Sequence, residues 1–374
     1  MSVAGIPGKV IVRTFTLINN FGTSSPTKYD VWPIVEGMSI YEGIFDPAMH
    51  GIAKLKDSNN LYSTLPITRD TYVKIVLQDP TTGKAVTGLY KIYKVSDIEQ
   101  ETPKVQTYII HFVSIEMFNM RKVRISKRVQ GNLPGEIKTI HEQISTKPIS
   151  ITEDNTKANV FLPFLPANQA LNLLLENAKW KATVPDYCYW ETFNGYNCKS
   201  LMSCALENPI HDFTTNTPTS GDVYNTFNYD DFTKIYEIIG DQNFDSLNTL
   251  YKGFDGATIY SYNPLEGSCD ITMIGEEPLS RVYTFSSDSL DYKSLSKRNQ
   301  ILQNITNTYY YIRTPGLLTR SSGDMANVRV FNGNNMNIQD TTFSGKRLIC
   351  GIVHVISNDS YYQNITLGDY VLQS

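Results

Sequence analysis

The chain contains 374 residues, of which 41% are apolar and 19% charged, and its formal net charge is −4. This length allows about two or three domains with a large core, and so mild a charge does not indicate a nucleic-acid partner held by bulk electrostatics. No apolar stretch of 18 residues occurs, and no apolar region follows a basic one at the start. We therefore expect neither a membrane span nor a secretory signal.

Neither the cysteine spacing nor any common catalytic motif indicates a catalytic or metal-binding site in this sequence. The five cysteines are odd in number and lack CxxC spacing, so we expect reduced structural thiols and synthesis in the cytoplasm. The sequence has no phosphate-binding glycine loop and no GxSxG elbow. Residues 141–145 begin like a zinc-binding HExxH helix, but Ser145 stands where the second histidine is needed, which favours an ordinary surface helix. The sequence therefore predicts no catalytic residue, no metal and no cofactor.

Residues 8–120 alternate apolar and polar side chains, a pattern typical of strands in a small antiparallel barrel or sandwich. The alternation is clearest on both sides of a turn-rich connection near residues 57–67. The predicted strands are Lys9–Leu17, Met38–Phe45, Gly51–Lys56, Tyr72–Leu77, Gly88–Val95 and Gln106–Ile115.

The pattern changes between residues 121 and 210, where helical spacing appears. Leu133–Ser145 has Pro134 in its first turn and isoleucines on one face, and Pro166–Trp180 has a second apolar face, so both are predicted helices. Strands on both sides of Asn194-Gly195 are predicted to form a hairpin. This part of the chain is expected to be a compact α+β unit.

Strand-like segments return after a polar linker at residues 211–224. The predicted strands are Thr233–Ile239, Thr249–Lys252, Thr258–Tyr262, Ser268–Ile274, Thr308–Arg313, Met325–Phe331, Lys346–Ile356 and Tyr361–Leu372. Between them, Ser286–Asn304 is polar but compatible with a helix that begins at a serine cap.

One basic cluster occurs near the start of the predicted α+β unit. It consists of Arg121, Lys122, Arg124, Lys127 and Arg128. Such a cluster fits an acidic partner protein or nucleic acid passing nearby, but the pattern favours a solvated domain junction. No aromatic residue lies within the cluster, which argues against a platform on which single-stranded bases stack.

Four stretches, taken in order, suggest a family. They are Ile40–Asp46 with Gly51–Leu61 and Leu65–Ile67; Ser126–Ile144; Phe164–Ala178 with Tyr189–Tyr196 and Lys199–Leu201; and Gly345–Ile349 with Val353–Ile356 and Tyr361–Leu367. In this order and at similar spacing, they resemble the baseplate hub (tail hub) proteins of contractile-tailed bacteriophages. Residues 210–300 show little to match.

The resemblance implies a mainly β fold with α+β insertions, in which two tube-like antiparallel barrels flank smaller α+β domains. The implied divisions are 1–120, first barrel; 121–210, α+β domain; 211–285, β-rich segment of the second barrel; 286–305, helical insertion; and 306–374, the remainder of the second barrel. The function implied is structural and not enzymatic: a virion protein of the tail baseplate. Three chains would form a ring with pseudo-sixfold symmetry that joins the sixfold tail tube to a trimeric central spike.

The implied partners are two further copies of the chain, the spike, the tail tube or a tube initiator, and the surrounding baseplate wedge proteins. No specific nucleic-acid binding is expected. We expect the trimer contacts at barrel edge strands, where backbone groups lack partners, with Met38–Phe45 and Lys346–Ile356 as contributors. The candidate interface residues are Ile40, Tyr41, Ile44, Phe45, Arg121, Lys122, Arg124, Arg347 and Ile349. Two alternatives stay open, namely a tail fibre or receptor-binding adhesin and a tail-tip cell-wall hydrolase.

Overall fold

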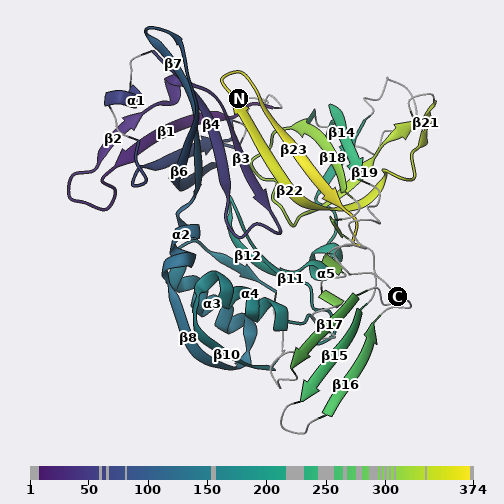
Figure 1. The fold of residues 1–374 in the computed structure, drawn as a ribbon. Helices are drawn as coiled ribbons and strands as arrows, with labels where there is room; N and C mark the ends of the chain where they lie inside the picture. Colours follow the sequence, from purple (N-terminus) through teal and green to yellow (C-terminus); the bar gives the residue numbers. More distant parts are fainter. Residues whose placement is uncertain are drawn as a thin grey trace.

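The computed structural model describes residues 8–58, 61–64, 67–80, 82–152, 157–215, 231–242, 257–263, 268–274, 280–285, 309–332 and 335–370, with a few single residues and pairs between 294 and 306. Two barrel-like β domains lie side by side in this part of the chain. A smaller α+β domain lies below the first barrel, and a three-stranded sheet lies below the second (Figure 1).

The first barrel is a curled run of antiparallel strands around an aliphatic and aromatic core. Its core includes Phe15, Ile40, Tyr90 and Phe112, each at most 2% exposed. Every predicted strand of this region is confirmed, with small shifts of its ends. The elements are β1 (Ile11–Asn19), β2 (Thr27–Asp30), a 3-10 turn η1 (Trp32–Ile34), β3 (Val35–Gly43), β4 (His50–Asp57), α1 (Leu61–Thr64), β5 (Tyr72–Gln78), β6 (Ala85–Thr102) and β7 (Val105–Ser114).

The second barrel is assembled from segments that are distant in sequence. Its core contains Phe213, Ile312, Ile352 and Ile365. Its strands are β13 (His211–Thr214), β14 (Glu237–Gln242), β18 (Tyr309–Pro315), β19 (Met325–Arg329), β22 (Gly345–Ser357) and β23 (Tyr361–Gly368), with a 3-10 turn η2 (Asp231–Thr233). A small hairpin of β20 (Phe331–Asn332) and β21 (Asn335–Gln339) extends from it.

One sheet joins the two barrels. In strand order it runs β14-β18-β23-β22-β3-β4-β7-β6-β5-β1-β2; off this path, β19 pairs with β22 and β13 pairs with β19. The joining pair is β3 with β22, antiparallel from Gly37 opposite Ser357 to Gly43 opposite Gly351. This sheet of thirteen strands therefore forms one continuous wall that belongs to both barrels.

The α+β domain packs two amphipathic helices against a two-stranded ribbon and a three-stranded sheet. Its elements are α2 (Ile115–Lys122), β8 (Arg124–Asn132), α3 (Leu133–Ile144), β9 (Ile149–Ile151), β10 (Lys157–Pro166), α4 (Ala167–Asn177), β11 (Tyr187–Thr192), β12 (Gly195–Ser200) and α5 (Leu201–Ala205). Both predicted helices and the hairpin are confirmed, and Gly195 adopts a φ of +123° at the turn.

The helix that carries His141 is not the surface helix expected from the sequence. The imidazole is buried, with Nδ1 2.8 Å from the Tyr189 hydroxyl and Nε2 2.7 Å from the Lys147 carbonyl oxygen. The isoleucines of α3 form the buried face of the helix, and His141 lies at the edge of that face. Its ring can be buried with them because both ring nitrogens have polar partners.

Part of residues 211–285, which are expected to contribute to the second barrel, forms a separate sheet instead. The strands β15 (Ala257–Asn263), β16 (Ser268–Ile274) and β17 (Ser280–Phe285) form a separate sheet in the order β16-β15-β17. Of the described residues between 211 and 285, only those in β13 and β14 join the large sheet. The predicted strand Thr249–Lys252 lies outside the described residues, and so does most of the predicted helix at 286–305.

Candidate assembly surface

The shared sheet has one face that no helix of the described chain covers. Across it lie partly exposed side chains from both barrels in continuous register, since Tyr41 pairs with Val353 and Ser39 with Val355. The pattern extends to neighbouring strands, where Ile52 lies opposite Ser39. We call this the open face. Its partly exposed members also include His50, Ile109, His111, Val113, Tyr311, Arg313, Tyr362, Asn364 and Thr366.

The opposite face of the same strands is buried in the two cores, because strand side chains alternate. The open face itself carries a mixture of apolar, tyrosine and polar side chains, a composition typical of a partly buried surface. Two shallow depressions lie on it: one of about 490 Å³ among β3, β4, β7, β22 and β23, and one of about 310 Å³ lined by Tyr41, His50 and Tyr311. The Tyr41 and His50 rings stack there, with centroids 4.9 Å apart and planes 4° from parallel.

The sheet has free edges that expose apolar residues. In the described chain, β14 pairs only with β18, and it exposes Ile238 and Ile239. At the other barrel, β6 pairs with β5 up to Lys91, so residues 93–102 pair with β7 alone and expose Tyr93 and Ile98. Exposed apolar edges are templates for pairing with another chain.

Three of the predicted interface residues are not on any surface. Ile40, Ile44 and Ile349 are each 0% exposed. Ile40 is part of the first core, Ile44 packs in the cluster that contains Trp190, and Ile349 is in the core of the second barrel. The prediction for these three side chains is wrong, because each takes an inward position of a strand or of the turn after it.

The two strands expected to expose barrel edges also do not. Met38–Phe45 falls largely in β3 and Lys346–Ile356 in β22, and these strands pair with each other inside one chain. Each has a second neighbour as well, β4 for β3 and β23 for β22. Their backbone groups are therefore satisfied within the subunit. In the described chain the edges lie elsewhere, on β14 and β2 at the two ends of the strand order and along the outer half of β6.

The remaining predicted residues occupy three different places. Tyr41 lies on the open face, and Phe45 is exposed at the rim of the smaller depression. Arg347 is internal: it forms an ion pair with Asp369, and its guanidinium carbon lies 5.0 Å from the centre of the Tyr310 ring. The basic residues Arg121, Lys122 and Arg124 are exposed on the α+β domain.

Sequence reasoning missed most of the open face. Val353 and Val355 are half-exposed although they belong to the apolar run Ile352–Ile356. A strand with apolar residues on both faces is the signal that could have identified them, because one face must then be covered by something other than its own core.

A buried acid and histidine face each other beneath the barrel junction. Glu42 Oε2 lies 4.0 Å from His354 Nε2, and Glu42 Oε1 accepts a 2.8 Å hydrogen bond from the Ser322 amide. Burial raises the pKa of Glu42 to about 8 and lowers the pKa of His354 to about 3. Both side chains are fully enclosed, so no substrate contacts them and the pair is part of the core.

A second buried network joins the α+β domain to the first barrel. Lys147 Nζ forms ion pairs with Glu191 and, at 3.0 Å, with Glu116. The other oxygen of Glu191 accepts a 2.8 Å bond from the Met49 amide of the barrel. The Ser114 hydroxyl, at the end of β7, donates to Glu191 Oε1 at 2.9 Å. These bonds fix the domain against the barrel wall.

The described residues contain no cluster of three or more histidine, cysteine or acidic side chains able to hold a metal ion. Within the same residues, no helix is long and apolar enough to span a membrane. Four of the cysteines, Cys188, Cys198, Cys204 and Cys350, are free and buried. Burial raises the pKa of each of these thiols, to about 11 at Cys188.

The arrangement is that of a mainly β protein in which two barrels share one wall and flank an α+β domain. This is the fold of phage tail proteins. The structure superposes with a TM-score of 0.57 and 12% sequence identity on the tail protein from Neisseria meningitidis MC58, covering 95% of this chain and 96% of the other. It superposes with a TM-score of 0.59 and 9% identity on the 43 kDa tail protein of prophage MuSo2 from Shewanella oneidensis, covering 95% and 99%.

The sequence-based expectations for fold class and for tail-protein resemblance are confirmed at the level of the fold. By sequence, no family model and no curated protein matches the chain. At 9–12% identity the common feature is architecture, which packing preserves long after individual side chains have changed.

Proposed function

We propose that this chain is a structural subunit of a phage tail, the baseplate hub, and that three copies form a ring around a bore. The observation that carries the proposal is the β3–β22 pairing, which makes two barrels one wall with a single open face. Three such walls supply six barrels, the number needed to match a sixfold tube with a threefold spike. The open face would then line the bore.

Ring closure in this proposal uses two of the free edges, β14 and the outer half of β6. The β14 edge of one copy would add to the outer half of β6 in the next, which continues the sheet from chain to chain as β3–β22 continues it within a chain. Ile238 and Ile239 on one edge, and Tyr93 and Ile98 on the other, would become buried. The contact is heterologous, because it joins two different edges. If each copy is rotated by one third of a turn relative to the last, three copies close a ring.

The partners in the proposal follow from the ring. One end would meet the tail tube or its initiator, the other the trimeric spike, and the outside the wedge proteins of the baseplate. The place of action is the tail of the virion. No enzymatic step is part of this function, because assembly needs complementary surfaces and no reacting group.

Native mass tests the ring directly. The 42.3-kDa chain should appear as a trimer of about 127 kDa, alone or once the spike is added. Ile239→Asp would place an uncompensated charge at the buried edge and return the protein to single chains. Ile271→Asp is the matched control, because Ile271 is also exposed but lies on the separate sheet.

Two results would overturn the proposal. One is a chain that stays monomeric at its highest soluble concentration and also in the presence of the spike. The other is a trimer that Ile239→Asp leaves intact, which would move the interface away from β14. In the first case, glycan-binding and cell-wall hydrolysis assays would test the adhesin and hydrolase alternatives.

A further inference from the structure

The ribbon of β8 and β10 carries two kinds of exposed side chain on its outer face. The strands pair antiparallel from Lys157 opposite Asn132 to Pro166 opposite Arg124. Their inner face is buried against α3 and α4 through Val129, Val160 and Leu162. No other strand pairs with either of them in the described chain. We call the outward side of this pair the ribbon face.

One strand of the ribbon face is cationic. Arg124 and Arg128 of β8 point outward, two pleats apart, and Arg121 and Lys122 lie just before them at the end of α2. Arg128 Nε donates a 2.8 Å hydrogen bond to the Asn159 side chain. Lys127, on the other side of β8, is paired with Glu136. Among the described residues, no carboxylate forms an ion pair with Arg121, Lys122 or Arg124.

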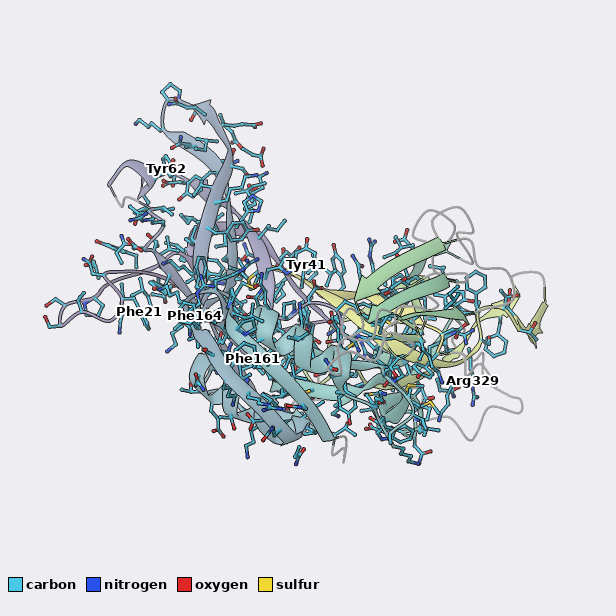
Figure 2. All side chains as sticks on the ribbon, turned by 60° about the horizontal axis from the view of Figure 1, so that its bottom comes forward. Phe21, Tyr41, Tyr62, Phe161, Phe164 and Arg329 are labelled. Atoms are coloured by element: carbon cyan, nitrogen blue, oxygen red, sulfur yellow. The ribbon has the colours of Figure 1, made fainter. Side chains whose placement is uncertain are left out.

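The other strand of the ribbon face is aromatic. Phe161 is 63% exposed and lies directly opposite Arg128, while Phe164, three residues on, is 67% exposed. Figure 2 shows both on the α+β domain, away from Tyr41 on the open face. Large apolar side chains exposed together, beside cations without counter-ions, mark a surface that another molecule covers.

The backbone at Phe164 supports the same conclusion. The register shifts between Leu162 and Leu165, so the ribbon has a bulge there, and Phe164 adopts a φ of +52°. A left-handed conformation is unfavourable for a bulky residue, and a bulge redirects its side chain. Within the subunit Phe164 gains no burial in return, and an exposed residue held in a strained conformation points to a functional contact.

The chemistry of the ribbon face favours a protein partner over nucleic acid. Arginine beside aromatic rings is the composition of interface centres between proteins. Binding of single strands instead requires a continuous basic groove, and the whole chain has a net charge of −4. The sequence alone could not show this composition, because the phenylalanines enter the basic cluster only through strand pairing.

We propose that the ribbon face docks a segment of a partner protein rich in acidic and apolar side chains. Carboxylates of the segment pair with Arg124 and Arg128, and its apolar side chains cover Phe161 and Phe164. The ribbon face lies on the α+β domain below the first barrel, whereas the two edges proposed to close the ring belong to the shared sheet (Figure 1). The proposal therefore does not rest on the ring, and the two can fail separately.

The test is fluorescence anisotropy on the full-length chain with a labelled peptide that alternates glutamate and leucine. A lysine–leucine peptide and an oligothymidylate serve as competing probes. We expect the acidic peptide to bind, and Phe164→Ser or Arg124→Glu to weaken it about tenfold or more. The matched controls, Ile271→Ser and Arg69→Glu, change exposed residues elsewhere and should leave binding unchanged.

A second variant separates docking from folding. Phe164→Gly relieves the strained backbone, because glycine accepts a positive φ, so it should raise the thermal midpoint while it weakens peptide binding. Failure of the acidic peptide to bind would overturn the proposal, and so would tighter binding of the oligothymidylate. Loss of the trimer in Phe164→Ser would also overturn it, since the occupant would then be a second copy of the chain.

Discussion

Among the partly exposed charged residues of the α+β domain, Lys147 is the one whose replacement should lower the domain's stability most. Its side chain is about a quarter exposed, but the carboxylates it neutralises are almost fully enclosed: the side chains of Glu191 and Glu116 are 1% and 6% exposed. Burial lowers the pKa of Lys147, and the two carboxylates more than offset this, so the net shift is upward. The lysine is therefore charged in the folded protein at neutral pH.

Lys147→Met keeps most of the side-chain volume and removes the charge. Two carboxylates then share one buried site without a counter-ion. Breaking a buried ion pair by removing one partner costs about 3–5 kcal/mol, and we expect the free energy of unfolding of this domain to fall by that amount. Adding Glu191→Gln should recover part of the loss, because one of the two uncompensated charges is gone while the bond to the Met49 amide stays.

The assay is urea unfolding followed by tryptophan fluorescence, since Trp180 and Trp190 both lie in the α+β domain. Burial raises the pKa of Glu191 even with Lys147 present, and loss of the lysine raises it further. The folded variant then holds a proton that the unfolded chain releases, so its stability falls as pH rises. The deficit of Lys147→Met should therefore be smaller at pH 5 than at pH 8.

Lys54→Met is the control, because Lys54 forms its 2.9 Å ion pair with Glu36 on the surface, where such pairs contribute little. The reasoning is refuted if Lys147→Met unfolds at the same urea concentration as Lys54→Met. A deficit that does not change between pH 5 and pH 8 would also refute it, since the loss would then come from packing.

Three further predictions concern the barrels. Gly51→Ala should destabilise by about 1–3 kcal/mol, because its Cβ would lie 2.5 Å from a backbone oxygen, whereas Gly240→Ala meets nothing within 4 Å; thermal unfolding of the pair checks this. Ile40→Lys should yield insoluble protein and Tyr41→Lys soluble, folded protein, as expression and circular dichroism would show; equal outcomes would contradict their opposite faces. Glu42 has a folded pKa of about 8 against 4.5 unfolded, so its contribution is fully present below pH 4.5 and is lost as pH rises from 4.5 to about 8. Glu42→Gln should flatten the pH dependence of the unfolding midpoint over this range, and an unchanged slope would exclude this role.

The candidate surface could be predicted from sequence only in part. The basic residues of the α+β domain and Tyr41 were recognised and are exposed or half-exposed. Ile40, Ile44 and Ile349 were assigned to the interface and are buried. A strand shows its two faces by alternation, but where both faces are apolar the alternation does not say which one the core takes.

Local signals determined much of this protein without its tertiary structure. Helical spacing in Leu133–Ser145, strand alternation in the first barrel, and Asn194-Gly195 as a hairpin turn each depend on residues a few positions apart, and each is confirmed. The pairing of β3 with β22, separated by about 300 residues, and of β8 with β10 depends on long-range contacts. Backbone hydrogen bonds are alike in every strand, so only the packed structure decides which strands meet. It thereby decides where the open face, the free edges and the ribbon face lie.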